Sequence, residues 1–311
     1  MIFRGNPAIR VVAFLACQVL CLGTSHSQVT EGNPLGEEIS RQDHIYWSYG
    51  GQTREGYTVD RGLAEYGSVL AFEFHRALES LGPKDRWLDI GAGEGQAILD
   101  YFGPEGWAQR GRKAQVVALS IEDRRTLRWQ QTAATVESGR LRYLYNRRLR
   151  EYSVEELGRF QIITDVIGGF SYTEDLSQFV EKVLGFLEVN GSFYTVLQDV
   201  RSEIETRKPH YAGASYLTEI TNTDGSEGKI CTWLKSISCA AVTCEPRTNW
   251  VPPIEAYAIR KVCDNVVVPP LTPTHYQAGT PPERSFRLAS PKPSPAPQRP
   301  EAVKVEASKK P

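Results

Sequence analysis

Three glycines at alternate positions follow a short apolar segment of the chain. The stretch from Arg86 to Gln96 reads RWLDIGAGEGQ, and its glycines are Gly91, Gly93 and Gly95. Glycine adopts turns that other residues resist, and it lets a ligand approach the backbone. A strand that ends in such a loop before a helix is typical of sites for nucleotide-like ligands.

Gln96 separates this loop from the fingerprint of dinucleotide-binding proteins. That fingerprint is G-x-G-x-x-G, whereas this chain has G-x-G-x-G with Gln96 where the third glycine would stand. The phosphate-binding P-loop is also missing, because no Gly-Lys-Ser/Thr follows the glycines. The pattern therefore disfavours NAD and ATP as ligands.

Strand-like and helix-like runs alternate around this loop, from about Glu31 to Asn265. One amphipathic helix is predicted over 63–81, and a capping box at Ser171 predicts another helix that continues to Leu187. The predicted strands cover 86–91, 114–120, 141–146, 160–169, 192–198, 238–245 and 254–262. Such alternation implies an α/β fold with a mostly parallel sheet that is covered on both faces. The ligand then lies beyond the carboxyl ends of the strands, at the switch point of the sheet.

The glycine loop and the segments that follow it resemble a known protein family. LDIGAGEG resembles motif I of the class I S-adenosylmethionine (SAM)-dependent methyltransferases, and VVALSIED and FQIITDVIGGFSYTEDL resemble the regions of their second and fourth strands. VLGFLEVNGSFYTV is similar to the turn into their fifth strand, so the likeness covers roughly 88–197. The resemblance implies a single Rossmann-like domain with a doubly wound, seven-stranded sheet whose last strand pair is antiparallel. It also implies SAM as the cofactor.

The resemblance assigns the glycine loop to the cofactor. Gly91, Ala92, Gly93 and Gly95 would line the methionine and ribose portions of SAM. Asp89 would order that loop, reach the cofactor's amino group, or do both.

Two further cofactor positions depart from the family pattern. The acid that binds the ribose hydroxyls normally ends the second strand, where this chain has Ser120. Glu122 would take that role if the strand continues, because residues two apart point to the same side of a strand. After the third strand, Asn146 would contact the adenine edge or serve in a structural turn.

Asp165 and Tyr172 are the candidate catalytic residues. Methyl transfer from a sulfonium is an in-line displacement that gains mostly from positioning, but an oxygen or nitrogen acceptor can also need a base. Both residues lie near the end of the fourth predicted strand. Asp165 is either a pocket residue, in contact with cofactor or substrate, or a paired structural acid.

The segment before the first strand is rich in aromatic residues and glycine. In similar enzymes this segment covers the cofactor and shapes the acceptor site. Tyr46, Trp47, Tyr49, Arg54 and Tyr57 are therefore candidate lid residues, with Arg54 able to pair with a carboxylate. The alternative is an aromatic cluster that packs on the sheet.

The two ends of the chain differ from its middle. Residues 1–27 have a basic start and an apolar run from Val11 to Gly23, and they predict a signal peptide cleaved near Ser27. The protein is then exported, to a periplasm or out of the cell, and has no membrane span; an uncleaved signal that anchors it is the alternative. We assign 28–60 to the lid, 61–265 to the methyltransferase-like domain and the proline-rich 266–311 to a disordered basic tail.

Four cysteines remain after signal cleavage: Cys231, Cys239, Cys244 and Cys263. They permit two disulfides in any of three connectivities, and four reduced, buried thiols are the alternative. The chain contains no CxxC and no nearby histidine pair, so no metal site is expected.

The sequence thus predicts a SAM-dependent methyltransferase that acts on a small molecule. A formal net charge of −1 argues against a dedicated nucleic-acid binder, which is usually strongly basic. The alternative is an exported, non-catalytic protein that binds a ligand or partner through a methyltransferase-like fold. The methyl acceptor and the oligomeric state stay open.

Overall fold

A computed structural model describes residues 61–103, 114–198, 217–247, 254–277 and 282–289. The predicted signal peptide, the lid and residues 290–311 of the predicted tail lie outside these ranges. Within them, no helix has the length and apolar character needed to cross a membrane.

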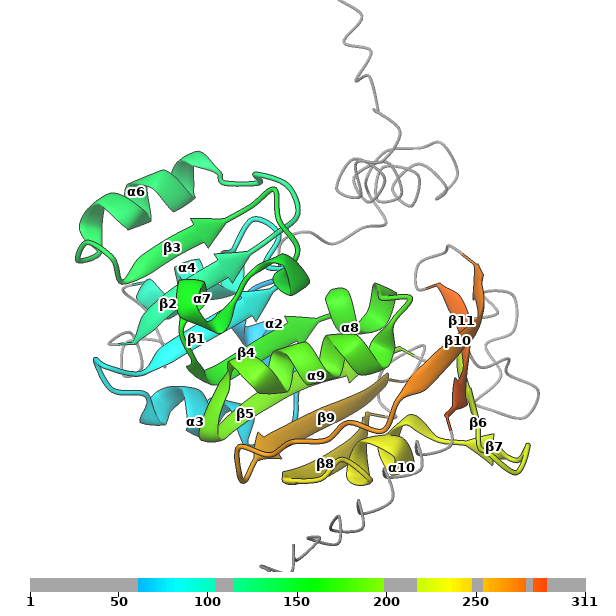
Figure 1. The fold of residues 1–311 in the computed structure, drawn as a ribbon. Coiled ribbons are helices and arrows are strands. Elements are labelled where there is room, and N and C mark those ends of the chain that lie inside the picture. The colour runs from blue at the N-terminus through cyan, green and yellow to red at the C-terminus, as the bar shows by residue number, and fades with distance from the viewer. Residues whose placement is uncertain (1–60, 104–113, 199–216, 248–253, 278–281, 290–311) are drawn as a thin grey trace, which may run out of the picture.

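A seven-stranded sheet forms the centre of the molecule, in the order β3-β2-β1-β4-β5-β9-β8 (Figure 1). The first five strands are parallel, and β9 runs antiparallel between β5 and β8. This confirms the predicted Rossmann-like sheet with its antiparallel last pair. The strands are β1 (Arg86–Ile90), β2 (Gln115–Leu119), β3 (Leu141–Leu144), β4 (Phe160–Val166), β5 (Leu187–Leu197), β8 (Ala240–Arg247) and β9 (Ile254–Lys261).

Helices cover both faces of the sheet because successive strand residues point to opposite sides. In β1, Trp87 packs into one buried cluster and Leu88 into the other. The cluster around Trp87 includes α2 (Leu63–Val69), α3 (Phe74–Ser80), α4 (Gln96–Phe102) and α6 (Leu127–Thr135). The cluster around Leu88 includes η2 (Leu149–Glu151), α7 (Val154–Leu157), α8 (Gly169–Tyr172), α9 (Leu176–Phe186) and α10 (Ile230–Lys235).

The prediction of one continuous helix over 63–81 was wrong, because the chain breaks at Leu70 between α2 and α3. Residues at the end of β8 contact the segment between α2 and α3 and stabilise its non-helical conformation. The Arg247 guanidinium donates to the Leu70 carbonyl and stacks on the Phe72 ring, and the Glu245 carboxylate accepts the Phe72 N–H at 3.1 Å. These tertiary contacts interrupt the helix that the periodicity predicts. The apolar residues of that pattern are nevertheless buried.

The prediction that a long helix begins at Ser171 was also wrong. Ser171 lies inside α8, and its hydroxyl donates to the Val196 carbonyl of β5 at 3.3 Å. Asp175 caps α9 instead, since its side chain accepts the Gln178 N–H. The neighbouring strand therefore uses the hydroxyl that the capping box would have used.

A second, four-stranded sheet lies beside α8 and α9, in the order β10-β11-β6-β7 (Figure 1). It contains β6 (Thr218–Thr221), β7 (Glu227–Gly228), β10 (Leu271–Gln277) and β11 (Glu283–Leu288). The prediction of a disordered tail from residue 266 was therefore wrong over 266–277 and 282–289. The proline-rich composition hid two apolar anchors, Leu271 and Phe286, which are buried in the cluster that also contains α9.

Two disulfides join the four cysteines of the second half of the chain. Cys231 is bonded to Cys244, and Cys239 to Cys263. This selects one of the three connectivities that the sequence left open and replaces the alternative of four free thiols. The first bond ties α10 to β8. The second joins residues just before β8 and just after β9, at the end of this strand pair where Ala240 lies opposite Lys261.

Arg284 holds the second sheet against α8 from a fully buried position. Its guanidinium donates to the Thr173 carbonyl at 2.9 Å and to the Thr218 hydroxyl at 3.2 Å. We expect Arg284→Ala to lower the free energy of unfolding by about 2 to 4 kcal/mol, because buried acceptors lose a charged donor. Urea unfolding followed by circular dichroism measures this change.

Arg287 provides the matched control, since it lies on the same strand but is exposed. Arg287→Ala should change the free energy of unfolding by less than about 0.5 kcal/mol. Equal losses in the two variants would contradict the anchoring role of Arg284.

Candidate functional site

The glycine loop lies at the carboxyl end of β1, between β2 and β4. Gly91, Gly93 and Gly95 all have left-handed backbone conformations, with φ of 70°, 56° and 80°. The N–H groups of Gly91 and Ala92 both donate to the Leu119 carbonyl, at 2.9 and 3.1 Å. The loop is thus tied to the end of β2, at the edge where the parallel strands of such sheets meet a ligand.

Two aromatic side chains that the sequence analysis missed support this loop. The Tyr143 hydroxyl of β3 donates to the Gly93 carbonyl at 2.6 Å. Trp129 of α6 packs edge-on against the Tyr143 ring, with 5.0 Å between ring centroids. A Cβ atom at Gly95 would lie 2.4 Å from the Trp129 ring, so this glycine is required by a close approach as well as by its φ. No sequence signal beyond the aromatic content of these segments could have shown it.

Asp89 is a fully buried carboxylate at the end of β1. It accepts the Tyr66 hydroxyl of α2 at 3.0 Å and the Thr164 hydroxyl of β4 at 2.6 Å. Thr164 in turn accepts the indole N–H of Trp87 at 2.7 Å. Burial raises the pKa of Asp89 to about 7, although the bonds from Thr164 and Tyr66 act in the opposite direction. The structure therefore places Asp89 as a brace beneath the loop.

The residues after β2 do not continue the strand, which ends at Leu119. The condition under which Glu122 would replace the ribose-binding acid is thus not met. Ser120 is buried, and its N–H donates to the Leu144 carbonyl at 3.0 Å. The Glu122 carboxylate is paired with Arg124 at 2.5 Å, and only Ser120 follows the strand directly.

Asn146 occupies a turn at the end of β3. Its φ of 62° is left-handed, its side chain is exposed, and its N–H donates to the Ile121 carbonyl at 2.9 Å. Asparagine tolerates this conformation better than most residues. Of the two roles expected for Asn146, the geometry shows the structural turn.

Asp165 is also fully buried, but it lies on the opposite face of the sheet from Asp89, beside Phe170. Its carboxylate accepts the N–H groups of Gly168 at 2.8 Å and Phe170 at 3.0 Å. Burial raises its pKa to about 7, against these main-chain hydrogen bonds. The Asp165 carboxylate is thus held by main-chain donors, and it fixes the turn from β4 into α8.

Tyr172, the other candidate catalytic residue, ends α8 and is half-buried. Its carbonyl accepts the Tyr276 hydroxyl of β10 at 3.2 Å. The structure therefore brings Tyr172 to the contact between α8 and the second sheet.

The turn between Asp165 and α8 holds a strained residue that the sequence did not indicate. Ile167 has a φ of 54°, which is a rare conformation for a β-branched side chain. Such strain costs on the order of 1–3 kcal/mol and concentrates at functional sites. Ile167 follows β4 directly, and Gly168 beyond it lies against Gly91: a Cβ at Gly91 would be 3.2 Å from the Gly168 Cα.

The candidate lid residues lie outside the described residues. These are Tyr46, Trp47, Tyr49, Arg54 and Tyr57. Arg61, the first described residue after them, donates to the Val166 carbonyl at 3.5 Å and pairs with Glu65. The described part of the chain therefore begins beside the carboxyl end of β4.

Comparisons with known proteins give structural matches only. No family model matches the chain, and no curated protein matches it. An rRNA methylase from Streptococcus thermophilus is similar at 12% identity and a TM-score of 0.38, over 61% of this chain and 94% of that one. The glycopeptide N-methyltransferase MtfA, solved with SAM, is similar at 14% identity and a TM-score of 0.39, over 62% and 94% of the two chains.

A third match covers a smaller part of its counterpart. PKMT2 from Rickettsia typhi, solved with AdoHcy, is 18% identical with a TM-score of 0.31, over 40% of this chain and 24% of that one. The fold rests on the strand order and register of the chain itself.

The raised pKa of Asp89 makes stability depend on pH. Folding favours the protonated form, so this contribution is complete near pH 4 and is lost as the pH rises to about 7. We expect Asp89→Asn to remove that loss. Within this window, the variant should become more stable than the parent chain by on the order of 1 kcal/mol for each pH unit that the pH rises, as a difference in free energy of unfolding.

Urea unfolding at several pH values between 4 and 7 measures the effect. Glu79→Gln, an exposed change on α3, is the control and should follow the parent chain. A parent-to-Asp89→Asn difference that stays constant with pH would refute the assignment.

The contact between Gly95 and Trp129 can be separated from the cost of the left-handed backbone. Gly139 has nearly the same φ, 84°, but a Cβ there would meet nothing within 4 Å. Gly139→Ala should therefore cost about 1–2 kcal/mol, and Gly95→Ala about 1–3 kcal/mol more. Thermal or urea unfolding of both variants gives the comparison, and equal losses would show that Trp129 can move aside.

Proposed function

We propose that the chain is a SAM-dependent methyltransferase. One observation carries this: a loop with three left-handed glycines follows β1 at the switch point between β1 and β4 of this sheet. In open α/β sheets the ligand binds at that point. The sequence of the same loop resembles motif I of the class I methyltransferases, which links the position to SAM in particular.

The main chain of the loop fits the polar end of such a cofactor. Within the described residues, the N–H groups of Gly93 and Glu94 donate to no other group, so both are available to a ligand. Ser120, directly after β2, would hold a ribose hydroxyl, and Glu122 would do so only by sharing its carboxylate with Arg124. When bound, SAM supplies a methyl group on a sulfonium that is open to displacement.

This chain would promote transfer chiefly by placing the acceptor in line with that methyl group. We assign Asp165 no role as a base, because it is fully buried and its carboxylate already accepts the N–H groups of Gly168 and Phe170. An acceptor that is already nucleophilic therefore suits the site best. We further propose a small molecule as the acceptor.

A second candidate function is binding without transfer. It is favoured by the same commitment of Asp165 to the main chain and by the Glu122–Arg124 ion pair, which together leave few side chains for chemistry. In that case the glycine loop would hold a metabolite for transport, storage or signalling.

We also propose that the protein is exported. The basic and apolar start of the chain supports this, and so do the two disulfides. Disulfides persist mainly in oxidising compartments.

Isothermal titration of the purified chain with SAM tests the cofactor. We expect one binding site, weakened at least about tenfold by Gly93→Arg, because a long side chain would fill the loop where the ligand approaches. Gly139→Arg, at a glycine where a Cβ atom would meet nothing within 4 Å, should leave the affinity unchanged. No binding by the parent chain, or equal effects of the two variants, would overturn the assignment of this loop.

Transfer is then tested separately with SAM carrying a labelled methyl group. Incubation with fractions of small-molecule extract should give labelled product in the parent chain and none with Gly93→Arg. Binding without any labelled product from such extracts would favour the second function.

A further inference from the structure

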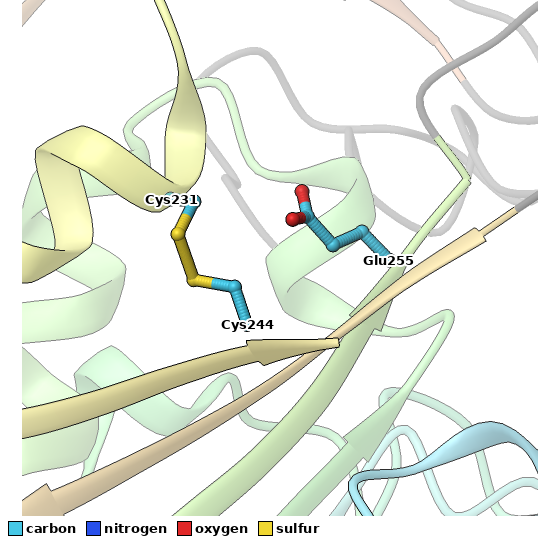
Figure 2. Close-up of side chains that lie close together, drawn as sticks. All are labelled: Cys231, Cys244 and Glu255. Carbon is cyan, nitrogen blue, oxygen red and sulfur yellow. A yellow bond between two sulfur atoms is a disulfide. The ribbon is translucent and has the colours of Figure 1, made fainter. Parts of the chain in front are cut away.

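Three side chains of types that can bind a metal come from different elements and lie close together (Figure 2). Cys231 comes from α10, Cys244 from β8 and Glu255 from β9. Their ligand atoms all lie within 4.8 Å of one another, and each residue is half-buried. No other group of three histidine, cysteine or acidic side chains in the described ranges is gathered in this way.

The strand register fixes two of the three side chains on one face. In the β8–β9 pair, Cys244 lies opposite Tyr257, and Pro246 opposite Glu255. Residues two apart share a face of a strand, so Cys244 and Glu255 are diagonal neighbours on the same side. The Tyr257 hydroxyl donates to the Glu255 carboxylate at 2.7 Å, which holds that carboxylate in place.

Two cysteine sulfurs and one carboxylate oxygen form a donor set suited to Zn²⁺. The two sulfurs are bonded to each other in this structure, and the ligand that zinc requires is a thiolate. We propose that Cys231, Cys244 and Glu255 form a redox-controlled Zn²⁺ site, which is closed in the disulfide form and opened by reduction.

The site opens in two steps, reduction of the disulfide and binding of the metal ion. A dithiol reductant gives two electrons and two protons to the Cys231–Cys244 bond, which becomes two thiols, while the reductant becomes a disulfide. Zn²⁺ then displaces both thiol protons and binds two thiolates and the Glu255 carboxylate. A water molecule completes the tetrahedral set.

The backbone spacing is compatible with both states. The Cα atoms of Cys231 and Cys244 are 6.1 Å apart. In a tetrahedral zinc site with Zn–S bonds of about 2.3 Å, the sulfurs lie about 3.8 Å apart. Rotation of two half-buried side chains can supply that separation. The site escaped the spacing rules for zinc because its ligands come from three elements and include no CxxC.

The test is a titration of the full chain with Zn²⁺ against a chromophoric chelator, before and after reduction with a phosphine. We expect the reduced chain to bind one equivalent and the oxidised chain none at this site. Cys231→Ser and Cys244→Ser should abolish the binding. Glu255→Gln, which keeps both cysteines, should weaken it by at least about tenfold.

The second disulfide provides an internal control. After reduction, a chain with both Cys239→Ser and Cys263→Ser should bind Zn²⁺ with the same affinity as the reduced parent chain. In the reduced parent chain, Zn²⁺ should also protect Cys231 and Cys244, but not Cys239 and Cys263, from alkylation, as read by peptide mass spectrometry. This readout compares thiols within one chain and does not depend on whether a variant folds.

The proposal fails if the reduced parent chain binds no Zn²⁺ or if all four thiols are alkylated equally in its presence. It also fails if Glu255→Gln binds as tightly as the parent. In that case the two thiols would hold the metal without the carboxylate that completes the proposed site.

Discussion

The buried carboxylate of Asp89 is the interaction on which the geometry around the glycine loop depends. A carboxylate is costly to bury without partners, and here Tyr66 of α2 and Thr164 of β4 supply them. The three residues join a helix and two neighbouring strands directly beneath Gly91. The Trp87 indole extends the network across β1. The start of the loop is therefore fixed by polar contacts inside an otherwise apolar layer.

The alternation of residues along the strands explains why the two buried acids have separate tasks. Asp89 faces α2, whereas Asp165, which pairs in register with Ile90, faces α8 on the other side of the sheet. One acid braces the turn after β1 and the other braces the turn after β4. The two turns touch where Gly91 approaches Gly168. The ligand-facing edge is thus built largely from main chain, and side chains behind it set its shape.

The parts of the fold that follow from local patterns could be predicted from the sequence. The five parallel strands and the final antiparallel pair are short runs rich in β-branched and other apolar residues, and the glycine loop combines a strand, a turn and a helix start. Features set by distant contacts could not be predicted. Arg247 breaks the helix at Leu70 from a position far along the chain, and Leu271 and Phe286 gain their burial only beside α9.

The candidate site shows the same division. The loop residues and Asp89 lie together at the end of β1, as predicted, because they are adjacent in sequence. The roles of Glu122 and Asp165 depended on where a strand ends and on which main-chain donors surround a carboxylate. Tyr143 and Trp129 reach the loop from β3 and α6, and no motif marks residues that act through such a contact.

The parallel pairing of β11 with β6 also bears on how the molecule is made. Arg284 lies beside Thr218 in that pair, and its guanidinium reaches back to Thr173. The small sheet can therefore close only after the segment through β11 has left the ribosome, or a translocation channel if the chain is exported. Until then the apolar side of α9 that receives Leu271 and Phe286 stays uncovered, which is the kind of surface that chaperones bind during synthesis.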